Sequence, residues 1–217
     1  MTTAQERKHQ ERQARRRRIQ RAAREVFAER GYAKTSIEQI ARQASLSVGA
    51  IYLYFRSKED LYVSLLEDTL QVFDAELTQA RTRTEVAGRL RAAWTVLTAW
   101  TANDVEGTRI LRLLAQPAVK AQLSEEVIQA VGQGISRVRE HLGTCIADGI
   151  HAGQYRAVNA GEVADLLWSL FIGALDAAEL RANLDLAPVA VAETTGAALA
   201  LVEASLGADR ATFQAAA

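Results

Sequence analysis

The chain has 217 residues, of which 49% are hydrophobic, so it is long enough to bury one core or two smaller ones. It contains no run of 18 apolar residues and no apolar stretch behind its charged N-terminus, and we therefore expect neither a membrane span nor a secretory signal. Its single cysteine, Cys145, excludes an internal disulfide and favours a reducing, cytoplasmic location.

Charge is distributed unevenly along the chain although the net charge is zero. Residues 1–58 contain 14 Lys and Arg against 5 Asp and Glu, a net charge of +9, whereas residues 59–217 contain 12 against 21, a net charge of −9. A basic head on an acidic body favours a polyanion as the partner of the head alone. A solvated basic surface without a partner is the alternative interpretation.

The first predicted element is a long amphipathic helix. Residues 1–12 have few apolar side chains and no clear period, so we expect them to form a disordered basic arm. Apolar residues then recur at helical spacing from Ile19 to Phe27, and Gly31 is placed to end the helix. The arginine run 15–18 lies at the start of this helix, where the dipole disfavours cations, so phosphate groups are the natural partners. For the arginines of the arm, a nonspecific solubilising role is an equally good interpretation.

Two short helices joined by a tight turn are predicted next. A capping box can begin the first of them in either of two registers, Thr35 with Glu38 or Ser36 with Gln39. Ser47 is placed to cap the second helix. Behind a longer first helix, this arrangement is typical of a helix-turn-helix unit whose second helix enters the major groove of DNA. An ordinary helical hairpin is the alternative.

We expect residues 13–73 to form a three-helix DNA-binding domain, with the helix-turn-helix at 36–55. The residues that carry a family pattern are Ile19, Ala22, Ala23, Phe27, Gly31, Tyr32, Thr35, Ser36, Ile40, Ala41, 47–52, Tyr54, Phe55 and 58–61. With these residues the stretch 19–61 resembles the tetracycline-repressor (TetR) family of bacterial transcription regulators. The family often has Gly where Ser45 stands, and Ser can take the required turn conformation at a small cost.

The resemblance implies a set of DNA contacts. One residue at the start of the first short helix is expected to bind a phosphate, four residues of the second to approach bases and backbone, and two residues beyond it to clamp phosphates. In this order they are Ser36; Ser47, Val48, Gly49 and Tyr52; and Tyr54 and Lys58. Charge alone adds Arg15 and Arg16. For Tyr52, core packing with a surface hydroxyl is the alternative interpretation.

Six further helices are predicted at 57–81, 85–102, 110–114, 124–153, 159–182 and 188–206. No strand pattern is present, so the chain is expected to be all-α with about nine helices. Residues 74–217 are expected to form a larger helical regulatory domain that binds ligand and dimerises.

The last two helices carry small residues at close spacing, among them Gly173, Ala177, Gly196 and Ala200. Small side chains allow helix axes to approach closely. The resemblance implies that these helices meet their copies in a homodimer. Packing within one chain is the alternative.

No catalytic motif, cofactor motif or metal-ligand set is evident in the sequence. His141 and Cys145 lie four residues apart on one helix, but two ligands do not make a metal site. The resemblance implies an effector pocket in the body, with Arg109 or Arg112 as a charged anchor. The candidate lining residues, which could equally be core, are Trp94, Leu97, Trp100, Ile110, Leu113, Leu114, Trp168 and Phe171.

These observations predict a dimeric repressor of a palindromic double-stranded DNA operator, released by a small apolar or amphiphilic effector and located in the bacterial cytoplasm at the nucleoid. A DNA-binding architectural or partner-docking protein without an effector is the alternative, and an enzyme is the third possibility.

Overall fold

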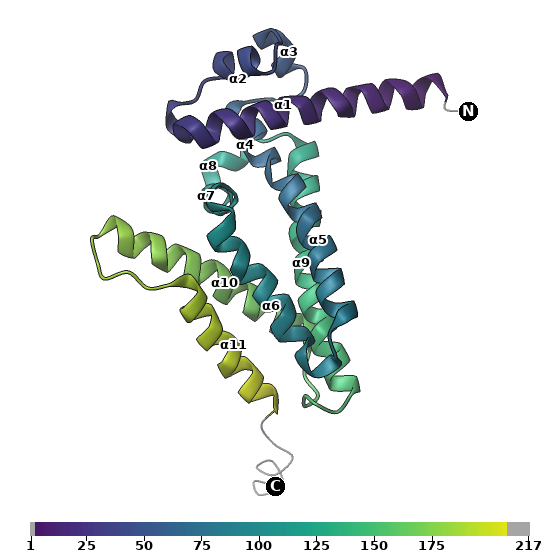
Figure 1. Cartoon of the computed structure of the whole chain (residues 1–217), viewed down its shortest axis with the longest axis vertical. Helices are drawn as coiled ribbons and strands as arrows, with labels where there is room; N and C mark the ends of the chain where they lie inside the picture. Colours follow the sequence, from purple (N-terminus) through teal and green to yellow (C-terminus); the bar gives the residue numbers. More distant parts are fainter. Residues whose placement is uncertain (1–2, 208–217) are drawn as a thin grey trace, which may run out of the picture. The chain divides into compact units, whose positions relative to one another are not determined.

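The computed structural model describes residues 3–207, and within this range the chain forms helices and no strand (Figure 1). The all-α prediction is confirmed, with eleven described helices where about nine were expected. No helix within this range is long and apolar enough to cross a membrane. The helices are α1 (Ala4–Lys34), α2 (Ile37–Gln43), α3 (Val48–Tyr52), α4 (Lys58–Ser64), α5 (Leu66–Arg83), α6 (Val86–Asn103), α7 (Val105–Leu114), α8 (Pro117–Lys120), α9 (Glu125–His151), α10 (Ala160–Asn183) and α11 (Val191–Gly207).

The chain divides into two compact units. The head unit comprises the described residues up to Thr69 together with Arg109–Gly132, and the body unit comprises Leu70–Thr108 together with the described residues from Gln133 onward. The sequence placed the first boundary at residue 73 and did not predict that 109–132 would join the head. A long-range cap joins the two segments of the head: Asp60 of α4 accepts hydrogen bonds from the backbone N–H and the hydroxyl of Ser124, which precedes α9.

Helix α1 is longer than expected, because it includes most of the arm predicted to be disordered. It begins with a capping box in which the Thr3 hydroxyl accepts from the Glu6 backbone and the Glu6 carboxylate accepts from the Thr3 backbone. The following Ala, Gln, Glu, Lys and Arg residues are all strong helix formers. The disordered-arm prediction is therefore wrong from Ala4 onward, and residues 1–2 lie outside the described range. Gly31, at φ +73°, interrupts the helix, and a last turn follows to Lys34.

The helix predicted at 57–81 is divided into α4 and α5 at Leu65. Two side chains of α1 reach the backbone at this point: the Gln20 amide donates to the Ser64 carbonyl at 3.1 Å, and Arg24 donates to the Leu65 carbonyl at 2.9 Å. The Leu65 N–H bonds three residues back, to Tyr62. Donors inserted from a neighbouring helix are a known cause of helix breaks. The other additional helix, α8, has Pro117 in its first turn, where proline is well tolerated.

The head core is a compact apolar cluster. Fully buried side chains from each of its first four helices meet there. Phe27 and Tyr62, both fully buried, have ring centroids 4.7 Å apart, and the half-buried Tyr32 packs against both rings. The other fully buried members include Ile19, Ile40, Ile51, Phe55 and Leu61. This core holds the helix-turn-helix as one piece.

Candidate nucleic-acid interface

Local hydrogen bonds position α2 at the start of the helix-turn-helix. Of the two possible capping boxes the second is formed: the Ser36 hydroxyl accepts from the Gln39 N–H at 3.4 Å, and the Gln39 side chain accepts from the Ser36 N–H at 2.9 Å. Thr35 is instead buried, and its hydroxyl donates to the Gly31 carbonyl at 2.8 Å. Thr35 therefore closes the end of α1, and Ser36 begins α2.

The turn between α2 and α3 requires a left-handed residue, and Ser45 supplies it with φ +53°. The turn is closed by hydrogen bonds from the Ser45 N–H to the Arg42 carbonyl and from the Leu46 N–H to the Ala41 carbonyl. A non-glycine residue in this conformation costs about 1–2 kcal/mol. The turn has the expected geometry with serine at this position.

Helix α3 presents a small, open front and is anchored from behind. The Ser47 hydroxyl caps it by accepting from the Ala50 N–H at 3.1 Å, while Ile51 and Phe55 are completely buried. Tyr52 is 53% exposed, which excludes core packing as its main role. Leu53, which the sequence interpretation did not single out, is 73% exposed. The exposed aromatic and aliphatic groups give this end of α3 an apolar contact surface.

Gly49 lies on the exposed front of α3. A Cβ atom built at this position would meet no atom of the chain within 4 Å. The glycine is therefore not required by packing inside the protein, and its φ is not in the left-handed region. The absence of a side chain leaves the α3 backbone open to close approach by another molecule.

The candidate phosphate contact at Ser36 has an internal competitor. A hydrogen bond from the Ser36 side chain is the main cause that lowers the pKa of the exposed Glu38 carboxyl, and Glu38 follows Ser36 in the first turn of α2. A carboxylate beside the helix N-terminus occupies the place that a phosphate would favour. A DNA phosphate at Ser36 would have to displace this interaction.

Lys58 has an internal function that the sequence interpretation did not foresee. Its ammonium group donates to the carbonyls of Tyr32 at 3.1 Å and Thr35 at 3.2 Å, and it lies 4.3 Å from the centroid of the Tyr32 ring. These contacts satisfy carbonyls at the C-terminal end of α1. The cation in the first turn of α4 is thus explained without an external anion, and one of its three N–H groups is left for any phosphate.

Arg16 is buried, and the expectation that it contacts DNA is wrong. Its side chain forms a two-pronged ion pair with Glu67, with one pair of atoms at 2.7 Å, and its Nε lies 3.6 Å from a Glu126 oxygen. Its guanidinium lies 5.1 Å from the centroid of the Phe55 ring. Burial lowers the pKa of Arg16, but the hydrogen bond and charge of Glu67 outweigh it and raise the pKa. Arg16 links α1, α5 and α9 to the end of the reading segment.

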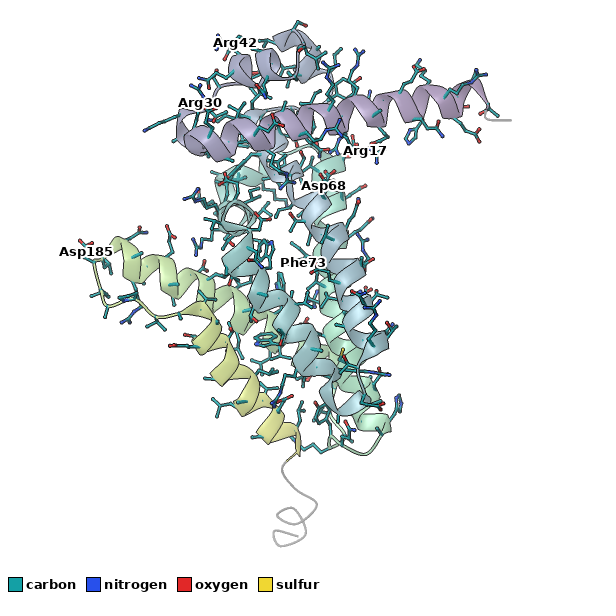
Figure 2. All side chains as sticks on the ribbon, viewed as in Figure 1. Arg17, Arg30, Arg42, Asp68, Phe73 and Asp185 are labelled. Atoms are coloured by element: carbon teal, nitrogen blue, oxygen red, sulfur yellow. The ribbon has the colours of Figure 1, made fainter. Side chains whose placement is uncertain are left out.

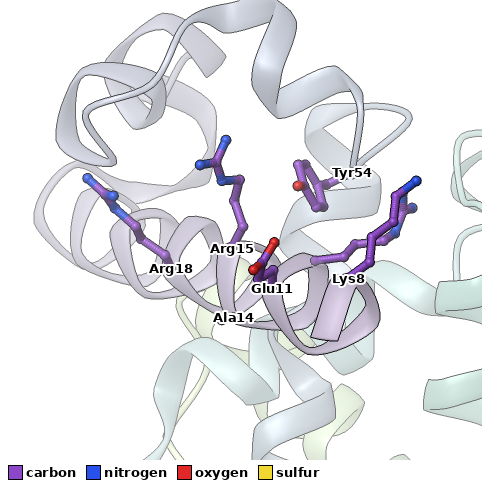
Figure 3. Close-up of a pocket in the computed structure, with 7 residues that line it drawn as sticks. Lys8, Glu11, Ala14, Arg15, Arg18 and Tyr54 are labelled. Atoms are coloured by element: carbon purple, nitrogen blue, oxygen red, sulfur yellow. The ribbon is translucent and has the colours of Figure 1, made fainter. Parts of the chain in front are cut away.

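Other cations of the head remain on its surface. Figure 2 shows Arg42 projecting from α2, and Arg17 and Arg30 projecting from α1. Arg15 is exposed and lines a groove of about 660 Å³ between α1 and Tyr54. We call this the α1 groove; Figure 3 shows it, and its lining residues are Lys8, Glu11, Arg12, Ala14, Arg15, Arg18 and Tyr54. Among these residues, the sequence predicted phosphate contacts for Tyr54 and, through the arginine run 15–18, for Arg15 and Arg18.

A profile of the family described as "Bacterial regulatory proteins, tetR family" matches residues 19–65, which comprise the C-terminal half of α1, the helix-turn-helix and α4. Residues 19–65 form a TetR-family DNA-binding domain.

Relatives and solved structures agree with this assignment. The HTH-type transcriptional activator FasR of Mycolicibacterium smegmatis is 33% identical over 141 residues, which cover 60% of this chain and 64% of that protein, so the chain spans just under two thirds of this relative. FadR of Bacillus subtilis, solved in complex with stearoyl-CoA, has a TM-score of 0.67 at 20% identity over 87% of this chain and 97% of that one. A transcriptional regulator of Saccharomonospora viridis, solved in complex with choline, has a TM-score of 0.66 at 19% identity over 89% and 98%. The two structures share their fold with this chain.

The eight candidate pocket residues are distributed over both units. Ile110, Leu113 and Leu114 belong to the head unit, and the other five belong to the body unit. Trp94 is buried, donates through Nε1 to the Thr195 carbonyl at 2.9 Å and lies edge-on to Phe171. Such contacts are those of a packed core. A single effector pocket lined by all eight residues stays a prediction.

His141, considered above for metal binding, pairs with Asp74, its Nε2 lying 2.9 Å from a carboxylate oxygen. Among residues 3–207, no group of three or more His, Cys, Asp and Glu side chains could hold a metal ion.

Helix α10 has an uncovered apolar stripe within the described chain. Its members recur in steps of four and three, which places them on one face of the helix, and all are exposed. No atom of the chain lies within 4 Å of the position of a Cβ at Gly173, the central member. The stripe consists of Leu166, Leu170, Gly173, Ala177 and Leu180.

Proposed function

We propose that this TetR-family regulator binds a palindromic operator as a homodimer, represses transcription from it and is released by an amphiphilic effector held in the body unit. The observation that carries the proposal is the front of α3. Ser47, Gly49 and Tyr52 are exposed there, above anchors that are completely buried. A rigidly held helix with a bare front fits the major groove of B-DNA, which is about 12 Å wide.

The reading surface in this proposal consists of Ser47, Val48, Gly49 and Tyr52. Val48 offers an apolar contact for a thymine methyl group, and Gly49 allows the backbone to approach the DNA. Tyr54, Ser36 and Arg15 contact phosphates around this surface. Lys58 holds α4 against the end of α1, so its contribution to binding is indirect.

Dimerisation supplies the second reading helix. One short helix reads too few base pairs for specific binding, and a two-fold dimer reads two half-sites about 34–36 Å apart. The exposed α10 stripe supports such a dimer, because leucines flanking a glycine and an alanine on one face allow the close approach of a second helix. The partner proposed for this stripe is the same stripe of a second copy.

The effector class is suggested by the Bacillus subtilis structure, which contains stearoyl-CoA. This ligand combines a long apolar chain with a charged head group, in keeping with the amphiphilic effector expected from the sequence. An effector releases the operator only if it binds one spacing of the two reading helices better than the other, and a shift from 1:99 to 99:1 requires about 5.5 kcal/mol of differential binding.

The reading surface is tested by the Gly49→Ala variant. Alanine favours a helix over glycine by about 0.8–1 kcal/mol, and nothing in the chain obstructs the added methyl group, so stability should stay equal or rise. Operator affinity should fall, because the methyl group prevents close approach to the DNA. The matched control is Gly132→Ala on α9, where a Cβ also meets no atom within 4 Å. Operator affinity that is equal in both variants would contradict the assignment of α3 as the reader.

The operator itself is obtained from a protection footprint on the DNA that flanks the regulator's own gene. Operator affinity is then measured with and without stearoyl-CoA, with choline as the comparison ligand. Loss of affinity with stearoyl-CoA alone, together with derepression of a reporter, supports the proposal. If neither ligand changes affinity and operator and random DNA bind alike, the chain functions as an architectural DNA-binding protein. If the reporter is induced by the DNA-bound protein, repression is wrong.

A further inference from the structure

Helix α1 extends well beyond the segment that matches the TetR-family profile. The profile begins at Ile19, whereas the helix begins at Ala4. The additional helical segment contains seven cations at positions 7, 8, 12, 15, 16, 17 and 18, of which only Arg16 is buried. The other six lie outside the core of the head and need another explanation.

The face of α1 that packs on the helix-turn-helix continues into this segment as a basic stripe. From Val26 toward the N-terminus, steps of four and three residues remain on one helix face. The residues met in this way are Val26, Ala22 and Ile19, all buried, and then Arg15, Arg12 and Lys8, all exposed. The same side of the helix that is apolar under the reading helices is thus basic beyond them.

Tyr54 stands at the inner end of this stripe and connects it to the reading segment. The Arg12 guanidinium lies 5.3 Å from the centroid of the Tyr54 ring, and Tyr54 follows α3 by two residues. In Figure 3, Arg15 and Arg18 project from α1 toward the side on which Tyr54 lies. The α1 groove between them contains one carboxylate, that of Glu11, against four cations.

The cations of the groove are not neutralised from within. Among residues 3–207, Lys8, Arg15 and Arg18 form no ion pair with a carboxylate, in contrast to Arg16 on the adjacent face. These three cations lie in one groove without carboxylate partners and repel one another, and an external polyanion removes this repulsion.

We propose that the α1 groove binds the sugar–phosphate backbone of the DNA immediately outside the half-site read by α3, a proposal that rests on the proposed function. The groove and α3 lie on the same side of α1, so one duplex can reach both. At a rise of 1.5 Å per residue, Lys8 and Arg15 are about 10 Å apart along the helix axis, a length of about three base pairs. Cations spread along a helix fit a linear polyanion better than a compact anion, because they do not converge on one point.

The test compares two double variants that each remove two positive charges from α1. Lys8→Gln/Arg15→Gln alters the groove, and Arg17→Gln/Arg21→Gln alters exposed arginines on the opposite face, where Figure 2 shows Arg17 pointing away from α2 and α3. Binding of a random-sequence duplex of about 30 base pairs, three helical turns, is measured at several salt concentrations. Loss of two phosphate contacts should lower the slope of log K against log salt by about 1.8 in the groove variant alone. Circular dichroism checks that both variants retain their helices.

Flanking DNA provides the second measurement. When the footprinted operator is trimmed by about three base pairs at each end, about 10 Å of duplex, the wild type should lose affinity and Lys8→Gln/Arg15→Gln should not. Equal slopes in the two double variants, or equal trimming effects in the groove variant and the wild type, overturn the groove proposal and leave α3 as reader. A wild type that binds neither duplex overturns the proposed function as well.

Discussion

Asp60 connects two separate segments of the head unit, and its replacement by asparagine is a sharp test of that connection. The side chain is completely buried. One carboxylate oxygen accepts from the Ser124 N–H at 2.8 Å and the Ser124 hydroxyl at 2.9 Å, and the other accepts from the Arg56 N–H at 2.8 Å. Asparagine has the same shape, but one of its two ends is an amide that donates.

The cost of Asp60→Asn follows from these contacts. In either orientation of the amide, one backbone N–H, that of Arg56 or that of Ser124, faces a donor and loses its acceptor. A buried donor left unsatisfied costs about 1–3 kcal/mol, and the remaining bonds lose the added strength of a charged acceptor. We expect the free energy of unfolding to fall by about 3 kcal/mol, which lowers Tm by about 6–12 °C in a chain of this size.

Urea denaturation followed by circular dichroism measures this loss as a lower midpoint at unchanged m-value. The control is Asp68→Asn, which removes an exposed carboxylate that lies 3.7 Å from Arg24. An exposed ion pair of this kind contributes about 0–1 kcal/mol. If the two variants lose the same stability, within about 0.5 kcal/mol, the buried carboxylate does not hold the start of α9 to the head and the reasoning fails.

Three further changes test single features of the fold. Burial raises the pKa of the Cys145 thiol from 9.0 to about 11, so between these values the folded state keeps a proton that the unfolded chain releases. The contribution of Cys145 to the free energy of unfolding is therefore fully present below pH 9 and falls by about 1.4 kcal/mol per pH unit from pH 9 toward pH 11. Urea titrations across this range should show this slope in the wild type and not in Cys145→Ala. Ser45→Gly should raise the unfolding free energy by up to about 1 kcal/mol, because glycine takes the left-handed turn without strain. Trp94→Phe should lower it by about 1–3 kcal/mol, because the buried Thr195 carbonyl loses its donor at 2.9 Å.

Each of these predictions has a contradicting result. An alkaline slope that is unchanged in Cys145→Ala would show that other groups cause it. Destabilisation of Ser45→Gly would mean that the serine side chain makes a contact worth more than the relief of strain. A Trp94→Phe variant as stable as the wild type would place water or another donor at the Thr195 carbonyl.

Most of the helix-turn-helix was predictable because its signals are local. The caps at Ser36, Ser47 and Ser57 each involve a backbone N–H three residues away, and all three are formed. The burial of Ile51 and Phe55 follows from their spacing of four on one face. The early start of α1 was missed, although Thr3 and Glu6 form a box of the same kind, because a charged stretch without apolar period was interpreted as disorder.

What the sequence determined by itself is therefore the series of helices, their caps, the anchors of α3 and the basic character of the head. These depend on contacts within one turn of helix, which the order of residues specifies directly. The tertiary structure alone decided which cations bind partners within the chain. Arg16 forms an ion pair with Glu67, 51 residues away, and Lys58 donates to carbonyls 23 and 26 residues earlier in the sequence. A run of similar arginines cannot reveal which of them turns inward, because that depends on acids that only folding brings beside it. The same physical reason separates Arg16, buried among carboxylates, from Arg15, its neighbour on the open groove.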